Sequence, residues 1–146
     1  MYNIKIKYIG GIKVDMKIYN NKNEIDTSNF RAWAEIDLSK LKHNVEVIRK
    51  LLHDDVDIIG VVKANAYGHG DIVVSKYLES IGVKHFAVAF IEEAIKLRKS
   101  GIKGEIIILG WTPCCRKDEL IKYDLCQTLV SEEYAEELNK LPGVVK

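Results

Sequence analysis

A lysine stands at the end of an apolar run, and a tyrosine follows it four residues later in a glycine-containing loop. The segment is IIGVVKANAYGHGD, residues 58–71, with Lys63 directly after the apolar residues and Tyr67 in the loop. A charge is costly to bury, so a lysine held in a cleft can become a neutral amine. A neutral amine is a nucleophile that forms a Schiff base with an aldehyde. The tyrosine hydroxyl can reach a ligand, which Gly68 and Gly70 allow the backbone to approach closely.

The same lysine also has a simpler interpretation. A lysine that leaves a strand can extend into solvent and do no chemistry, and this is the commoner case for an arbitrary strand-end lysine. The loop does not fit a known phosphate-binding pattern, because GHG is too short for a P-loop and does not match GxGxxG. His69 is more often a polar loop residue than a catalytic base. The residue types alone therefore make Lys63 a candidate and no more.

The elements that would position Lys63 alternate along the chain from Val56 onward. Apolar runs predict strands at 57–62, 85–90, 105–109 and 125–130, and helical spacing with capping residues predicts helices at 71–81, 91–99, 113–123 and from a cap at Ser131 to about 140. Near-continuous apolar strands are typical of parallel sheets, and their alternation with helices predicts an α/β fold. A doubly wound sheet and a (β/α)₈ barrel both fit, and in both the chemistry gathers where strands such as the one before Lys63 end.

The first twenty residues alternate apolar and polar side chains, which predicts a β-hairpin around Gly10-Gly11. A three-residue loop of Ile9, Gly10 and Gly11 would place the apolar residues on one face, with Gly11 in the left-handed position of a bulge. The pairs expected from that loop are Tyr8 with Ile12, Ile6 with Val14 and Ile4 with Met16.

The polar stretch Asn20–Asn29 is predicted as a linker, so we expect residues 1–29 to form a hairpin and linker and residues 30–146 to form the main domain. The main domain is predicted to open with a short strand at 31–37. A helix follows it, capped by Asp37 or Ser39. Its apolar residues have helical spacing: Leu38, Leu41, Val45, Ile48 and Leu52.

Composition excludes several other classes of protein. The 22 basic and 21 acidic residues give a net charge of +1, which offers no basic footprint for nucleic acid. No apolar run approaches the roughly 20 residues of a membrane helix, and the N-terminus lacks the apolar core of a signal peptide, so we expect a cytoplasmic protein with no membrane segment. The three cysteines, Cys114, Cys115 and Cys126, suit neither a disulfide framework nor a metal site, so no metal is expected.

The ten residues 61–70, VVKANAYGHG, resemble the signature of the alanine racemases, which are pyridoxal-phosphate enzymes of fold type III. The resemblance runs from Arg31 to about Lys140, and it is close to the racemase domain of the serine/alanine racemases of the vancomycin-resistance type. The supporting stretches are RAWAEIDL at 31–38, LKHNV at 41–45, FAVAF at 86–90 with EEA at 92–94, and IIILG at 106–110. The resemblance implies that the four βα units are the first half of a pyridoxal-phosphate-binding (β/α)₈ TIM-type barrel. The hairpin that precedes them has no counterpart in the family pattern.

The resemblance also implies roles for three residues. Lys63 would hold pyridoxal 5'-phosphate as a Schiff base and act as one of two proton-transferring bases. Tyr67 would hydrogen-bond the cofactor phosphate, and Leu109 would line the cofactor pocket. The implied activity is interconversion of L- and D-alanine, or of serine, to supply D-amino acids to peptidoglycan, in a homo-oligomer that is a dimer in the family.

Several parts of the family site have no matching position in this chain. They are the second base, the phosphate cup and the arginine that faces the pyridine nitrogen. We therefore expect a fragment with little activity by itself. A second hypothesis is a non-catalytic half-barrel that serves binding or assembly, because a half-barrel exposes sheet edges and apolar strand faces and should self-associate. A barrel decarboxylase with the same cofactor is a further alternative that matches the residues around Lys63 less well.

Overall fold

The computed structural model describes residues 2–9, 12–20 and 32–146. The chain divides into two compact units, Met1–Asp55 and Val56–Lys146. The predicted loop at Gly10-Gly11 and the linker residues 21–29 lie outside the described residues, so the predicted boundary between residues 29 and 30 stays a prediction.

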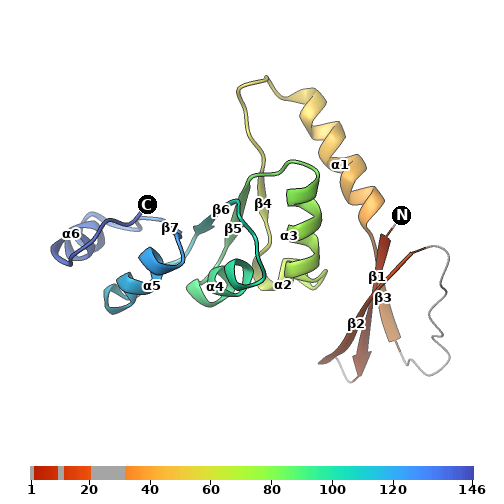
Figure 1. Cartoon of the computed structure of the whole chain (residues 1–146), viewed down its shortest axis with the longest axis horizontal. Helices are drawn as coiled ribbons and strands as arrows, with labels where there is room; N and C mark the ends of the chain where they lie inside the picture. The colour runs from red at the N-terminus through yellow and green to blue at the C-terminus, as the bar shows by residue number, and fades with distance from the viewer. Residues whose placement is uncertain (1, 10–11, 21–31) are drawn as a thin grey trace. The chain divides into compact units, whose positions relative to one another are not determined.

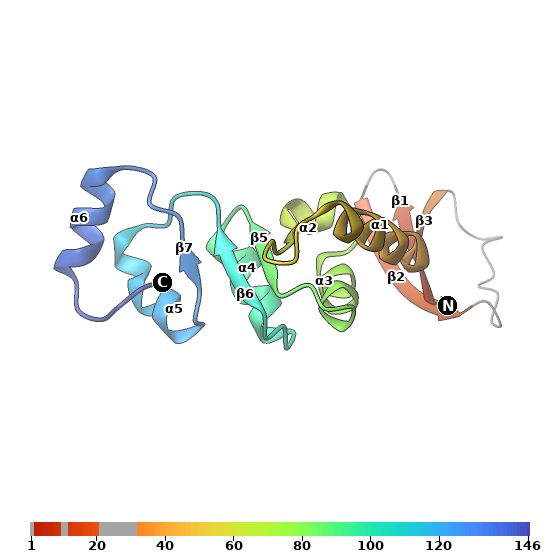
Figure 2. The ribbon, with the colours of Figure 1, turned by 90° about the horizontal axis from the view of Figure 1, so that it is seen from above.

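The first unit is an antiparallel three-stranded sheet followed by a helix. Its strands are β1 (Tyr2–Ile9), β2 (Ile12–Asn20) and β3 (Ala32–Asp37), in the order β2-β1-β3, and its helix is α1 (Leu38–Leu51). Figure 2 shows the three strands side by side. The predicted hairpin is confirmed, and its first strand also pairs with β3.

The predicted register of the hairpin is wrong. Ile9 pairs with Ile12, as in a two-residue connection, and an irregularity at Lys7/Tyr8 then shifts the register so that Ile6 faces Met16 and Ile4 faces Ile18. A β-bulge inserts one extra residue into a strand and shifts all later pairs by one. The bulge therefore pairs apolar residues with one another, as the alternating pattern requires, without the three-residue loop.

Asp37 begins α1 as its N-cap residue. Its Oδ1 accepts hydrogen bonds from the Ser39 N–H at 2.8 Å, the Ser39 hydroxyl at 2.6 Å and the Lys40 N–H at 3.4 Å. Of the two predicted caps, Asp37 is therefore the one that satisfies the orphan N–H groups, while Ser39 donates to it. The bond from the Ser39 hydroxyl is the main cause that holds the pKa of the Asp37 carboxyl below its usual value.

We expect Asp37→Ala to lower the free energy of unfolding by about 1 kcal/mol at neutral pH, because two backbone donors lose their acceptor. A folded-state pKa below the unfolded value means that this contribution is present above about pH 4 and is lost as the pH falls through the folded pKa. Urea unfolding at pH 7 and at pH 3 measures both effects. Asp37→Asn is the control, because its side-chain oxygen still caps the helix. An equal loss for Asp37→Ala at the two pH values would contradict the charged cap.

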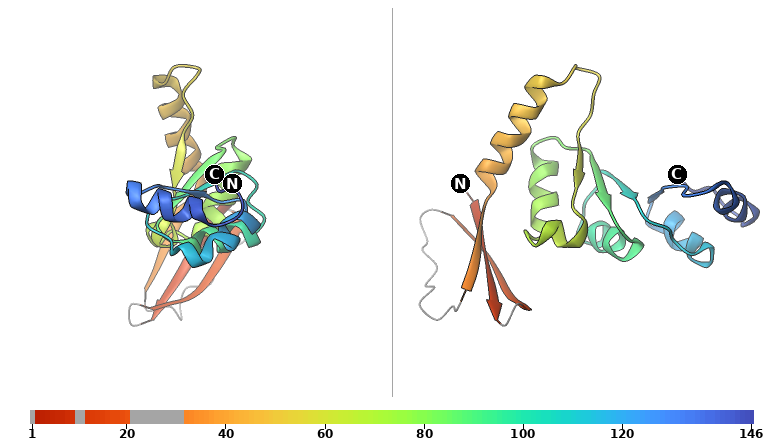
Figure 3. Two further views of the ribbon diagram at one scale, coloured as in Figure 1. Left: turned by 90° about the vertical axis from the view of Figure 1, so that its left-hand side faces the viewer. Right: turned by 180° about the vertical axis from the view of Figure 1, so that it is seen from behind.

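The second unit is a parallel α/β unit. Its strands are β4 (Ile59–Val61), β5 (His85–Val88), β6 (Glu105–Ile108) and β7 (Cys126–Gln127), in the order β4-β5-β6-β7 with every pair parallel. The connecting helices are α2 (Lys63–Tyr67), α3 (Asp71–Ser80), α4 (Ile91–Lys99), the 3₁₀ turn η1 (Cys114–Arg116) with α5 (Lys117–Lys122), and α6 (Glu132–Lys140) after β7. Figures 1 and 3 show the strands in this order. The predicted α/β class with a parallel sheet is confirmed.

One face of this sheet carries the core. Gly60, Phe86 and Ile106 are aligned across three strands, and the side chains of Phe86 and Ile106 have no exposed surface. A Cβ on Gly60 would lie 3.5 Å from the Phe86 ring, and a Cβ on Gly104 would lie 3.0 Å from it and 2.4 Å from the Lys84 carbonyl oxygen. The Phe86 ring therefore occupies space that is free because Gly60 and Gly104 have no side chains.

The opposite face of the sheet is open. Side chains alternate between the two faces of a strand, so Val61 and Ile107, which are aligned with Ala87, point away from the face that holds Phe86. Val61 is 43% exposed, and Ile59 is exposed as well. The described part of the chain thus presents apolar strand residues to solvent on this side.

Towards the C-terminus, at β7 and the helix before it, the observed elements are shorter than predicted. The strand predicted at 125–130 is only Cys126–Gln127, and Leu129 and Val130 beyond it are exposed. The helix predicted at 113–123 divides into η1 and α5, with Pro113 as the residue before the first turn. None of the helices in the described ranges is both long enough and apolar enough to cross a membrane.

Candidate functional site

Lys63 lies where β4 ends. The Val62 N–H donates to the Ala87 carbonyl at 2.9 Å, and Lys63, which is half-buried, follows directly. Figure 1 shows the segment that starts at Lys63, labelled α2, between β4 and α3. The predicted position at the C-terminal end of the first strand of the series is confirmed.

The backbone after Lys63 turns in the left-handed sense. Ala64, Asn65, Ala66 and Tyr67 have φ between 51° and 58°, and ψ of the first three lies between 43° and 49°. L-amino acids disfavour this conformation by about 1–2 kcal/mol per residue, and asparagine tolerates it best. Four consecutive non-glycine residues in this conformation are strained, so surrounding contacts must hold them.

Hydrogen bonds within the segment close this left-handed turn. The Ala66 N–H donates to the Val62 carbonyl at 2.9 Å, and the Gly70 N–H donates to the Asn65 carbonyl at 2.9 Å. The Asn65 side-chain oxygen accepts from the Asp71 N–H at 3.2 Å. Asn65 therefore links the turn to Gly70, the N-cap residue of α3, through its backbone, and to Asp71, the first residue of α3, through its side chain.

An ion pair between a buried carboxylate and a half-exposed lysine holds the start of α3. Asp71 is 4% exposed, and both of its carboxylate oxygens accept hydrogen bonds from Lys96 Nζ of α4 at 2.7 Å. Asp71 Oδ1 also accepts from the Ile72 N–H at 2.8 Å. Because Asp71 comes directly after the glycine-containing loop, this pair fixes the end of that loop against α4.

Glu93 of α4 holds the start of the turn. Its Oε1 accepts from the Ala64 N–H at 2.7 Å, and its Oε2 accepts from the Ala89 N–H at 2.8 Å and the Phe90 N–H at 3.4 Å. Phe90 is the N-cap residue of α4, and its side chain has no hydrogen-bond acceptor. Of the two reciprocal bonds of a capping box, only the one from the Phe90 N–H to Glu93 is therefore present. One carboxylate thus joins the loops that follow β4 and β5.

The two other predicted site residues lie at the same end of the sheet. Tyr67 closes the left-handed turn and is 61% exposed, and Leu109 follows β6 and is 44% exposed. The Leu109 N–H donates to the Val88 carbonyl at 2.9 Å, which continues the strand pairing to the end of β5. Lys63 and Leu109 belong to strands separated by β5, a spacing of about 10 Å. His69 contacts the Ala66 carbonyl at 2.8 Å through Nδ1, in keeping with a polar loop residue.

These residues suit a phosphorylated aldehyde such as pyridoxal phosphate. Lys63, half-buried at the start of the turn, has an amine that can form a Schiff base with the aldehyde. Tyr67, exposed on the same turn, has a hydroxyl that can donate a hydrogen bond to the phosphate, and Leu109, exposed two strands away, can contact the ring. The described residues contain no group of three His, Cys, Asp or Glu side chains that could hold a metal ion.

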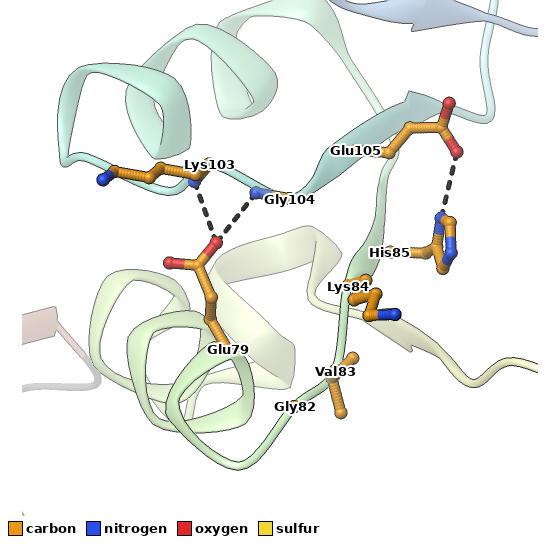
Figure 4. A pocket seen from close by; sticks show the side chains of 8 residues that line it. All are labelled: Glu79, Gly82, Val83, Lys84, His85, Lys103, Gly104 and Glu105. Carbon is orange, nitrogen blue, oxygen red and sulfur yellow. Dashed lines mark hydrogen bonds and ion pairs between the residues drawn. The ribbon is translucent and has the colours of Figure 1, made fainter.

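An open depression lies at the opposite end of the strands, where β5 and β6 begin (Figure 4). Its polar groups bind one another. Glu79 Oε1 accepts from the N–H groups of Lys103 and Gly104, each at 2.8 Å, and His85 lies between Glu105 at 3.0 Å and Asp57 at 3.3 Å. In parallel α/β folds the chemistry occurs at the C-terminal ends of the strands. We therefore interpret the polar groups of this depression as stabilising the fold, and we place the candidate site around Lys63.

Three residues that support the turn carry no signal in the sequence. Asp71 pairs with Lys96 where α3 packs against α4, and Glu93 of α4 accepts from the Ala64 N–H of α2. A Ser or Thr three residues before Glu93 would have indicated a capping box, but Phe90 stands there.

Comparisons with known proteins show what this chain is similar to. The family model described as "Alanine racemase, N-terminal domain" matches residues 36–144. A relative named "Amino-acid racemase" from Enterococcus faecalis is 51% identical over 114 residues, which are 77% of this chain and 16% of the relative. "Alanine racemase 1" from Clostridium acetobutylicum is 50% identical over 108 residues, 74% of this chain and 28% of the relative.

A solved structure, the alanine racemase of Clostridium difficile 630, is 42% identical with a TM-score of 0.67, and the match covers 70% of this chain and 28% of that one. The chain thus spans between about a sixth and just over a quarter of the length of these proteins. The prediction that the four βα units belong to an alanine-racemase barrel is confirmed.

Proposed function

Because this chain belongs to the alanine racemase family, we propose that it is the N-terminal part of the barrel of a pyridoxal-phosphate-dependent amino-acid racemase. Alanine is the proposed substrate, with serine second, and D-alanine for peptidoglycan in the cytoplasm is the proposed use. The observation that carries the proposal is the amine of Lys63, placed by a strained and externally held turn at the C-terminal end of β4.

The residues of this chain would do three things in the reaction. The Lys63 amine would hold the cofactor, and when free of it would remove or return the α-proton on one side of the substrate. The Tyr67 hydroxyl would donate to the cofactor phosphate, and Leu109 would contact the ring. When bound, pyridoxal phosphate supplies the electron sink that makes the α-proton acidic.

Racemisation needs a proton donor or acceptor on each side of the substrate, and no residue of the described part of the chain is proposed for the second side. We therefore expect this chain alone to capture the cofactor and to turn over little L-alanine. Assembly into a homo-oligomer is also proposed, supported by the exposed apolar residues Ile59 and Val61 on the open sheet face.

Reductive trapping tests the proposed function. The chain is mixed with pyridoxal phosphate, reduced with borohydride and mapped by peptide mass spectrometry. We expect the label on Lys63, and we expect Lys63→Met to lower the labelling of that peptide to background. Lys76→Met, which changes an exposed lysine on α3, is the matched control and should leave the label on Lys63 unchanged.

Two outcomes would count against the proposal. Label spread over the exposed lysines with no excess on Lys63 would remove the assigned cofactor lysine. Turnover of L-alanine by this chain at the rate of an intact racemase would show that the second base is present, contrary to the expected division of the site.

A further inference from the structure

The geometry points to Glu93 as a positioning residue for Lys63, an inference that rests on the proposed function. Within the described residues, its carboxylate accepts hydrogen bonds from backbone N–H groups. The one nearest Lys63 is the N–H of Ala64, at 2.7 Å.

The bond to Ala64 fixes the plane of the peptide next to the lysine. The carbonyl carbon of Lys63 and the nitrogen of Ala64 belong to one planar unit, so an acceptor that holds the Ala64 N–H also sets the rotation about the bond between Lys63 Cα and its carbonyl carbon. That rotation decides how the left-handed turn continues from Lys63. Glu93 therefore fixes how the lysine side chain is oriented relative to the turn that follows it.

The turn needs such an acceptor from outside. Ala64 has φ 51° and ψ 47°, a conformation that alanine disfavours, and its methyl group is exposed. Its carbonyl accepts from the Gly68 N–H at 3.2 Å inside the turn, so the contact from outside the turn is the one at its N–H. A carboxylate is the strongest acceptor that a side chain can offer to a backbone N–H. Without it, the first residue of the turn loses an external contact that opposes its strain.

The second oxygen of the same carboxylate anchors Glu93. Oε2 accepts from the N–H groups of Ala89 and Phe90, which follow β5. These bonds fix the Glu93 side chain, while its other oxygen holds the Ala64 N–H in the segment after β4. Glutamine at this position keeps the length but puts an NH₂ group opposite one of the two sets of N–H donors. Aspartate keeps the charge but is shorter by about 1.5 Å, so it can cap α4 without reaching Ala64.

The test compares Glu93→Gln and Glu93→Asp with Glu92→Gln in the full chain. Glu92 is the neighbouring residue on α4 and is paired with Arg116, away from the turn. Two quantities are measured: the amide hydrogen exchange of Ala64 and Ala89 by NMR, and the rate of reductive trapping of pyridoxal phosphate on Lys63. Urea unfolding identifies conditions in which all variants are folded.

We expect both Glu93 variants to speed the exchange of the Ala64 amide, and to slow trapping on Lys63, by about tenfold or more. Glu93→Asp should keep the protection of the Ala89 amide, which separates the positioning role from helix capping. Glu92→Gln should change neither quantity. Unchanged Ala64 exchange in Glu93→Gln would overturn the inference, and so would faster exchange with an unchanged trapping rate. If the parent chain traps no cofactor on Lys63, the proposed function fails, and the Ala64 exchange alone decides whether Glu93 holds the turn.

Discussion

Replacing Phe86 with alanine should lower the free energy of unfolding of the chain by about 3–5 kcal/mol. The ring has no exposed surface, and it lies against the positions of Gly60 and Gly104, where no side chain can move in to fill the space. The loss therefore includes both the buried apolar surface and the cavity left behind. A loss of this size is a large part of the 5–15 kcal/mol typical of a domain, so equilibrium unfolding in urea should show it clearly.

The chain offers a matched control in Phe90, which lies four residues later and is 60% exposed. Phe90→Ala removes the same atoms from a site open to solvent, so we expect its effect on unfolding to stay within about 0.5 kcal/mol. Similar losses for the two variants would mean that the ring of Phe86 does not hold the sheet and its helices together.

Lys96→Met should lower the free energy of unfolding by about 2–3 kcal/mol. Breaking a fully buried ion pair costs about 3–5 kcal/mol because it leaves an uncompensated charge. Here the Asp71 side chain is 5% exposed while that of Lys96 is 49% exposed, so solvent screening reduces the figure. Methionine keeps much of the packing of the lysine stem, so the loss reports on the charge and its two hydrogen bonds to Asp71.

A double-mutant cycle isolates this ion pair. Asp71→Asn removes the buried charge, so the combination of Lys96→Met with Asp71→Asn should cost less than the sum of the two single changes. Lys76→Met on α3 controls for the general effect of replacing a lysine with methionine. Additive losses in the cycle would show that the two residues do not stabilise one another.

The regular elements of the second unit were predictable because their pattern is strong. The helix expected at 91–99 is observed with those bounds, and the one expected at 71–81 ends one residue earlier, since caps and apolar spacing act locally. The strand predicted at 125–130 was too long, because this segment pairs with β6 only at Cys126 and Gln127. Apolar character alone does not tell whether a strand has a partner along its whole length.

The left-handed turn could not be predicted from residues 64–67. Alanine, asparagine, alanine and tyrosine have no common preference for positive φ, and the glycines at 68 and 70 predicted only a loop that a ligand can approach closely. Its contacts from outside the segment come from later helices, through Glu93 at Ala64 and through the pair of Asp71 with Lys96. The hairpin register failed for a related reason, because a bulge within β2 did what a longer loop was expected to do.

The separation between Ala64 and Glu93 has a consequence for biosynthesis. The two residues are 29 positions apart, and Glu93 is the later one to leave the ribosome. A nascent chain that has emerged only to the end of α3 carries Lys63 but no acceptor for the Ala64 amide, so the strained turn has no external support. The hydrogen bond from the Ala64 N–H to Glu93 can therefore form only after α4 has been translated and has packed in place. Under the proposed function, we expect cofactor capture to follow that event in time.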